Sequence, residues 1–228
     1  MPCIIHLETS TKVCSVALSK AGSVLFKKEN YNGSSHAEWL GVYVYEAFGY
    51  AKENNLKIDA VAVSSGPGSY TGLRIGLSEA KGFCYGLDVP LIAIPSLEIL
   101  ANQVILSGEN ADFFCPMIDA RRMEVYTAIF DKDMNQIKST GAEIIDENSF
   151  SDLLSEGKVC FFGDGASKCR TIIKSPNALF LDDVHPLASG MVFLAEKRYK
   201  QNKFENLAYF EPFYLKEFNA TVPKNKVI

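Results

Sequence analysis

The sequence predicts an α/β protein built from two copies of one β-β-β-α-β-α unit. Over residues 3–30, three short apolar runs are separated by polar or glycine-containing turns, as in a three-stranded meander. Helical periodicity follows over 37–51 and 70–87, with the pattern of a buried strand at 57–64 between them. The same order of elements then begins again at residue 113, which indicates a second copy of the unit.

An alignment of the chain with itself supports this duplication. Placing Leu7-Glu8 over Ile118-Asp119 brings CSVAL over VYTAI without a gap, and each half then has an acid at the end of its first strand. Two such units are the plan of the ribonuclease-H-like and actin-like folds, in which helices cover mixed sheets. We therefore expect subdomains over 1–106 and 107–228, with a late helix as a candidate for crossing back to the first.

The remaining elements have local signals of their own. Ser35 and Glu38 fit a capping box at the start of the first helix, and Ser96 fits a cap for a third helix. In the second half we expect strands over 113–119, 122–131, 135–146 and 158–163, a helix over 147–157 and a turn over 163–167.

Composition excludes several classes of protein. The chain has 228 residues, 47% of them hydrophobic, which is enough for a substantial core. The net charge of −4 without a basic run argues against independent binding to nucleic acid or membrane, so tRNA would be reached only through a partner. Six cysteines without a C-x-x-C pair, and no apolar segment of the roughly 18 residues that a span requires, predict a cytoplasmic protein with reduced thiols.

A glycine-rich turn, SSGPGSYTGLRIG over 64–76, lies between a predicted strand and a predicted helix. Such a turn can present backbone N–H groups to a phosphate, which makes Gly66, Gly68, Ser69 and Thr71 candidates for binding a nucleotide. The turn lacks the lysine of a Walker motif and the spacing of a Rossmann motif. The alternative is a tight connection in which Ser69 caps the helix.

The predicted helices over 37–51 and 70–87 are expected to form a protein–protein interface. Gly72, Gly76 and Ala80 recur at a spacing of four, which allows close approach of another backbone, while Trp39 and Tyr43 replace the usual charges of an outer face. The alternative is that the backbone approaching these small residues belongs to the same chain. The predicted interface residues are His36, Trp39, Leu40, Tyr43, Gly72, Arg74, Ile75, Gly76 and Ala80.

Five motifs are spread over almost the whole chain: IHLETSTKVCSVAL, SSGPGSYTGLRIGLSEAKG, IPSLEILA, DARRMEVY and EPFYLK. Together they resemble the TsaB (YeaZ) proteins of bacterial tRNA threonylcarbamoyladenosine synthesis. The resemblance implies an actin-like fold related to the Kae1/TsaD glycoprotease-like proteins. It also implies a non-catalytic partner of TsaD, which transfers threonylcarbamoyl to the adenosine beside the anticodon of tRNAs reading ANN codons.

The partners implied by the resemblance are TsaD, in a direct heterodimer, and TsaE, which would hydrolyse ATP. No cofactor is expected in the isolated chain; ATP or ADP in the complex and homodimerisation of the free chain are left open. Two positions depart from the family pattern: Glu8 stands where Asp is more common, and Lys216 where Arg is.

The alternative function is a stand-alone actin-like hydrolase of the glycoprotease type, or a small kinase. Catalytic relatives bind metal through an H-x-x-x-H helix, but His6, His36 and His185 are far apart, so we expect no metal site. Glu8, Asp119 and Asp164 are the candidate acids of a kinase, although turn or capping roles are favoured for both aspartates.

Overall fold

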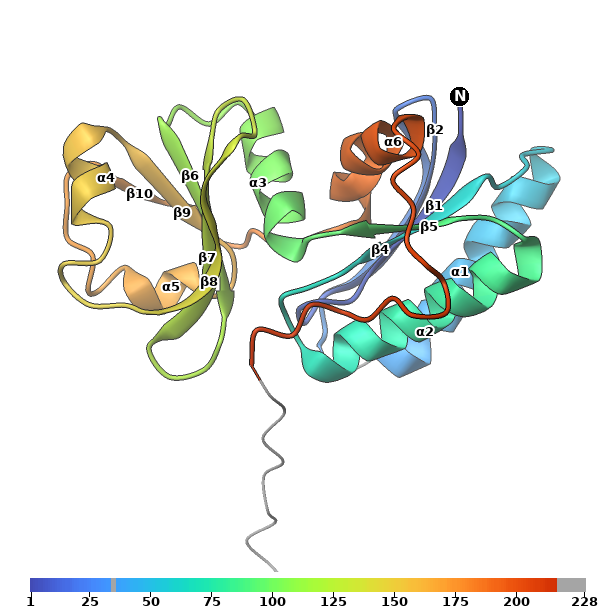
Figure 1. Ribbon diagram of the computed structural model, residues 1–228, viewed down its shortest axis with the longest axis horizontal. Coiled ribbons are helices and arrows are strands. Elements are labelled where there is room, and N and C mark those ends of the chain that lie inside the picture. The colour runs from blue at the N-terminus through green and yellow to red at the C-terminus, as the bar shows by residue number, and fades with distance from the viewer. Residues whose placement is uncertain (34–35, 217–228) are drawn as a thin grey trace, which may run out of the picture.

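The structure is a computed structural model that describes residues 1–33 and 36–216, folded into two halves that lie side by side (Figure 1). Each half contains a five-stranded mixed sheet. The first sheet has the order β3-β2-β1-β4-β5, and the second, counted from its opposite edge, has the order β8-β7-β6-β9-β10. Both orders trace the same path, so the predicted duplication and the actin-like plan of two α/β halves are confirmed.

The first half alternates strands and helices as the sequence predicts. In it β1 pairs antiparallel with β2 and parallel with β4. Its elements are β1 (Cys3–Glu8), β2 (Cys14–Lys20), β3 (Ser23–Asn30), α1 (His36–Glu53), β4 (Ala60–Ser64), α2 (Tyr70–Leu87), β5 (Leu91–Ile94) and α3 (Ser96–Leu106).

The second half repeats this order with shorter helices. Its β6 pairs antiparallel with β7 and parallel with β9. Its elements are β6 (Phe113–Asp119), β7 (Glu124–Asp131), β8 (Gln136–Ile144), α4 (Ser151–Glu156), β9 (Val159–Phe162), α5 (Ala166–Cys169), β10 (Ala178–Phe180), the 3-10 helix η1 (Ala188–Met191) and α6 (Val192–Lys200).

Two helices are exchanged between the halves. Although α3 follows β5 in the chain, it lies beside the second sheet (Figure 1), and its Leu100 packs with Phe114 and Phe162 of that sheet. Conversely, Leu194 of α6 packs with Ile92 of the first sheet. Ile99 of α3 also packs with Ile92 of the first sheet, so α3 contacts both halves, and the boundary at residue 106 stays a prediction. The late helix, α6, lies on the first sheet.

Alternating side chains on β1 show how one strand serves both faces of the first sheet. Ile5 and Leu7 join the core beneath α1 and α2, whereas Ile4 joins the core beneath α6. This period of two is the ordinary geometry of a strand buried on both faces. It also places Glu8 on the face away from α1 and α2.

The helix starts differ in part from those predicted. Ser69 caps α2, because its Oγ accepts a hydrogen bond from Gly72 N at 3.2 Å. Ser96 does not cap α3: it is the first helical residue, Pro95 takes the cap position, and no side chain caps the helix. Ser35, predicted as the cap of α1, lies outside the described residues.

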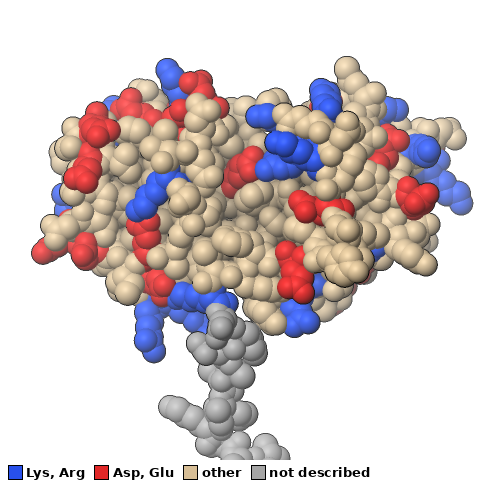
Figure 2. Space-filling model, in the orientation of Figure 1, with Lys and Arg blue, Asp and Glu red and all other residues tan. Residues whose placement is uncertain are grey.

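Charges of both signs are interspersed over the face of the molecule seen in Figure 2. This agrees with the modest net charge of −4. Among the helices of the described ranges, none has both the length and the apolar character that crossing a bilayer requires.

Candidate functional site: the glycine turn and the α1–α2 surface

The glycine turn between β4 and α2 is filled by the chain's own backbone. Ser69 N donates to Ser10 O at 2.6 Å, and a Cβ on Gly68 would overlap that same carbonyl oxygen. Gly66 has a φ of +102°, and a Cβ there would lie 2.7 Å from Phe213 O. Glycine is required at both positions, because a side chain would collide with a backbone carbonyl oxygen.

The contacts of the turn support the interpretation as a tight connection. Gly66 and Gly68 lie against protein carbonyls, Ser69 caps α2, and Thr71 is exposed. Ser69 is thus confirmed as the N-cap, while nucleotide binding by Gly66, Gly68, Ser69 and Thr71 stays a prediction.

The small face of α2 also packs within the chain. A Cβ on Gly72 would overlap Thr9 O, a Cβ on Gly76 would overlap Thr9 Oγ1, and Ala80 is fully buried. Thr9 Oγ1 in turn donates to Gly72 O at 2.8 Å. The element that packs closely against these small residues is therefore the connection between β1 and β2.

The interface prediction is consequently wrong for the members that the core encloses. Leu40 is 1% exposed, and His36 is buried with its Nε2 donating to Thr11 O at 2.8 Å. Side chains enclosed in this way cannot contact a second protein. The corrected residues are His36, Leu40, Gly72, Gly76 and Ala80.

Other residues of the two helices do reach the surface. α1 and α2 lie side by side on one face of the first sheet, held by Phe48 and Phe83, whose ring centroids are 4.9 Å apart (Figure 1). Of the predicted interface residues, Trp39 and Arg74 are exposed, and Tyr43 and Ile75 are half-buried. These four keep their predicted place on the outer side of the helix pair.

Sequence reasoning missed the most exposed members of this outer side. Tyr45 is 79% exposed and Tyr85 is 84% exposed. On α2, a Cβ added to Gly82 or Gly86 would meet no heavy atom of residues 1–33 and 36–216 within 4 Å. We define the α1–α2 surface as Trp39, Val42, Tyr45, Ile75, Gly82, Tyr85 and Gly86. The spacing of three from Trp39 through Val42 to Tyr45 was the available signal, because it follows one side of a helix.

Glu8, a candidate acid, is enclosed at the end of β1. Its side chain is fully buried, Oε1 accepts from Ser10 N at 2.5 Å, and Oε2 has no partner among the described residues. Burial raises the pKa of Glu8 to about 7, although hydrogen bonds, chiefly from Ser10, oppose the shift. The same burial lowers the pKa of His6, on the same strand, to about 3.

The two candidate aspartates shape the turns after β6 and β9. Asp164 Oδ1 accepts from Asp119 N at 3.0 Å, and Asp119 Oδ1 accepts from Arg121 N at 2.9 Å. Lys168 forms an ion pair with Asp119 and also donates to Glu124 O at 2.8 Å. The turn role that the sequence favoured is confirmed for both aspartates.

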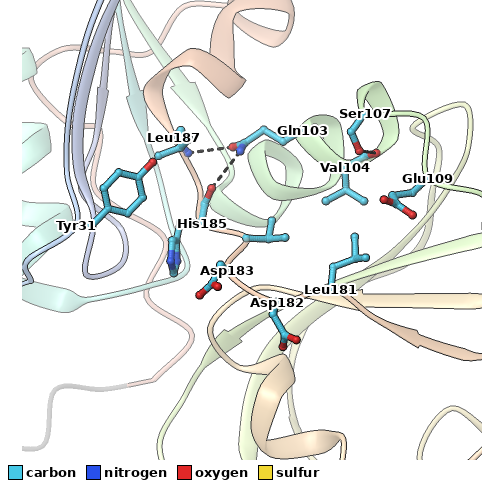
Figure 3. A pocket seen from close by; sticks show the side chains of 11 residues that line it. Tyr31, Gln103, Val104, Ser107, Glu109, Leu181, Asp182, Asp183, His185 and Leu187 are labelled. Carbon is cyan, nitrogen blue, oxygen red and sulfur yellow. Dashed lines mark hydrogen bonds between the residues drawn. The ribbon is translucent and has the colours of Figure 1, made fainter.

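A pocket of about 390 Å³ lies between the halves (Figure 3). In its wall, Gln103 of α3 forms hydrogen bonds with two residues of the segment before η1. It donates to His185 O at 3.1 Å and accepts from Leu187 N at 2.9 Å. The rings of Tyr31 and His185 are 5.9 Å apart, and burial, followed by the charge of Lys12, lowers the pKa of His185. Within residues 1–33 and 36–216, no group of three or more His, Cys, Asp or Glu side chains could hold a metal ion.

Comparison with known proteins agrees with this architecture. Residues 30–224 match the family model described as TsaD, tRNA N6-adenosine threonylcarbamoyltransferase. The tRNA threonylcarbamoyladenosine biosynthesis protein TsaB of Escherichia coli K12 is 30% identical over 93% of this chain and 94% of that protein. The chain belongs to the TsaB (YeaZ) family.

Further relatives cover the chain to different extents. TsaB of Haemophilus influenzae is 28% identical over 93% of each chain, whereas TsaB of Bacillus subtilis is 32% identical over 56% of this chain and 54% of that protein. The structure of YeaZ from Pseudomonas aeruginosa has a TM-score of 0.80 at 25% identity, covering 94% of this chain and 100% of that one. The resemblance of this chain to TsaB proteins thus extends to the arrangement of both halves.

Proposed function

We propose that this TsaB-family chain is a non-catalytic subunit in tRNA threonylcarbamoyladenosine biosynthesis. Its place in the pathway follows from the names of its relatives. Its role would be to bind a TsaD-type transferase through the α1–α2 surface. The observation that supports this most strongly is the exposure of Tyr45 and Tyr85 near Gly82 and Gly86 of α2, where an added Cβ would meet no atom of the described residues within 4 Å.

The composition of this surface favours a protein partner. Each helical glycine costs about 1 kcal/mol relative to alanine, and within the described part of the chain no close packing at Gly82 or Gly86 requires a residue without a side chain. Tyrosine and tryptophan are enriched at the centres of protein interfaces, where they bury large areas. A partner helix lying across the glycines would bury Tyr45 and Tyr85 at its edges.

The transferase is the partner that best fits this surface. The chain itself matches the TsaD family model over residues 30–224, so a TsaD protein would share the two-half plan and an equivalent helix pair. Two such pairs face to face would form a four-helix contact. Without the transferase, the same surface would suit a second copy of this chain.

The acids that a kinase or hydrolase would use have other tasks in this chain. Asp119 and Asp164 hold turns, and Glu8 is sealed inside the first half. We therefore assign the transfer chemistry to TsaD. Any ATP or ADP would bind in the assembled complex, TsaE would be a second partner, and tRNA would be bound by the complex rather than by this chain alone.

Reconstitution with TsaD from the same organism tests the proposal. The chain alone should show no transfer to tRNA, and adding it to TsaD with TsaE, ATP and the threonylcarbamoyl donor should give modification. The double variant Tyr45→Glu, Tyr85→Glu should lose at least about thirtyfold in affinity for TsaD, because charges would replace central aromatic contacts.

Tyr209→Glu is the matched control, since Tyr209 is 83% exposed but lies outside the α1–α2 surface. Parent-like binding by the double variant would refute the assignment of the surface. Peptidase or ATPase turnover by the isolated chain would instead support the stand-alone enzyme.

A further inference from the structure

The C-terminal segment over residues 205–216, which contains the EPFYLK motif, runs from α6 back to the boundary between the halves (Figure 1). Glu205 N donates to Leu91 O at 2.9 Å, which starts the segment at the edge of the first sheet. Phe213 N then donates to Ser65 O at 2.7 Å, just before the glycine turn. The segment is therefore attached to the first half at two points.

The end of the segment contacts the second half. Tyr214 still packs on the first half, with its ring centroid 4.8 Å from that of Tyr70 at the start of α2. Two residues later, Lys216 forms an ion pair with Glu124 of β7, and its Nζ lies 5.9 Å from the ring centroid of Tyr126. A stretch of four residues thus spans the two halves.

We propose that residues 213–216 form a clasp that sets the angle between the halves, with Lys216 as its releasable end. The attachment at Phe213 is a backbone hydrogen bond packed against Gly66, where any side chain would collide with Phe213 O. The attachment at Lys216 is an exposed ion pair, with 40% of the lysine and 24% of the glutamate side chain accessible, and such pairs are weak. Opening should therefore begin at Lys216.

Two other connections join the halves. The chain crosses from the first sheet to the second through α3, which packs on both, and it returns through 181–187 to η1 and α6. Ser15 Oγ accepts from Ala188 N at 2.9 Å near the second crossing. The clasp adds a third connection, which joins the start of α2 to β7.

Distance measurements between spin labels test the clasp. Labels at Lys57→Cys and Lys132→Cys would report on the two halves, because both positions are exposed and the six native cysteines are buried. Lys216→Ala should broaden or shift the distance distribution, and it should make the Phe213 amide exchange about threefold to tenfold faster. The charge swap Lys216→Glu with Glu124→Lys should restore the parent distribution.

Lys200→Ala is the matched control, because Lys200 is also exposed and ion-paired, but with Glu196 on its own helix. It should leave both readouts unchanged. A distance distribution for Lys216→Ala identical to that of the parent would overturn the proposal, whatever the exchange rate of Phe213. Neither measurement involves the transferase, so the result is independent of the proposed function.

Discussion

A Cβ at position 76 would overlap Thr9 Oγ1, whereas a Cβ at position 82 of the same helix would meet no atom of the described residues within 4 Å. Gly76→Ala should therefore destabilise the chain by about 1–3 kcal/mol, since the hydrogen bond from Thr9 to Gly72 must be displaced. Gly82→Ala should stabilise it by about 1 kcal/mol through helix propensity. Urea unfolding of both variants measures the difference, and equal effects would contradict the packing described for α2.

Glu8 predicts a pH dependence of stability. Its pKa is about 7 in the folded chain against an ordinary value of 4.5, so the folded state holds the proton more tightly. The stabilisation from this protonation is complete below pH 4.5 and is lost as the pH rises through 7, a change of about 3 kcal/mol. Glu8→Gln removes this loss, so the variant should gain stability relative to the parent between pH 5 and pH 8.

Unfolding of the parent and of Glu8→Gln at both pH values checks this sign. The comparison with the parent is necessary because His6 contributes the opposite slope. Its pKa of about 3 lies below the ordinary 6.5, so its stabilisation is present above pH 6.5 and is lost as the pH falls toward 3. A difference between parent and variant that does not change with pH would exclude a protonated, buried Glu8.

At the level of elements, the start of α2 depends on Ser69. Its Oγ satisfies Gly72 N, one of the N–H groups that a helix start leaves free, so Ser69→Ala should cost about 1 kcal/mol. Ser78→Ala is the matched control, because Ser78 is exposed in the middle of the same helix. Thermal unfolding should separate the two variants; equal midpoints would mean that the cap contributes nothing.

α2 also shows how far a sequence can be interpreted. The spacing of Gly72, Gly76 and Ala80 correctly indicated a close backbone approach, but spacing cannot identify the approaching element, which is Thr9 on a distant connection. Gly82 and Gly86 have the same spacing of four, but a Cβ added at either position would meet no atom within 4 Å among the residues that the structure describes. Inward and outward small residues become distinguishable only when tertiary contacts are known.

At the scale of the whole molecule, the duplication could be predicted because both halves show the same local patterns. An acid ends β1 and β6, and each half has three strands before its first helix. The position of α6 on the first sheet agrees with the expectation that a late helix crosses back. The packing of α3 on the second sheet could not be predicted, because an amphipathic helix shows that it has an apolar face but not which sheet receives it. The hydrogen bond from Phe213 to Ser65 could not be predicted either, because the two residues are far apart in the chain.

The central claim is that the α1–α2 surface binds a TsaD-type transferase, and site-specific photo-crosslinking tests it most directly. A photoreactive residue at position 85 would probe the surface, and one at position 209, equally exposed, would probe a site outside it. With TsaD from the same organism present, position 85 should crosslink to the transferase and position 209 should not. Crosslinks to TsaD from position 209 alone, or from neither position, would contradict the claim.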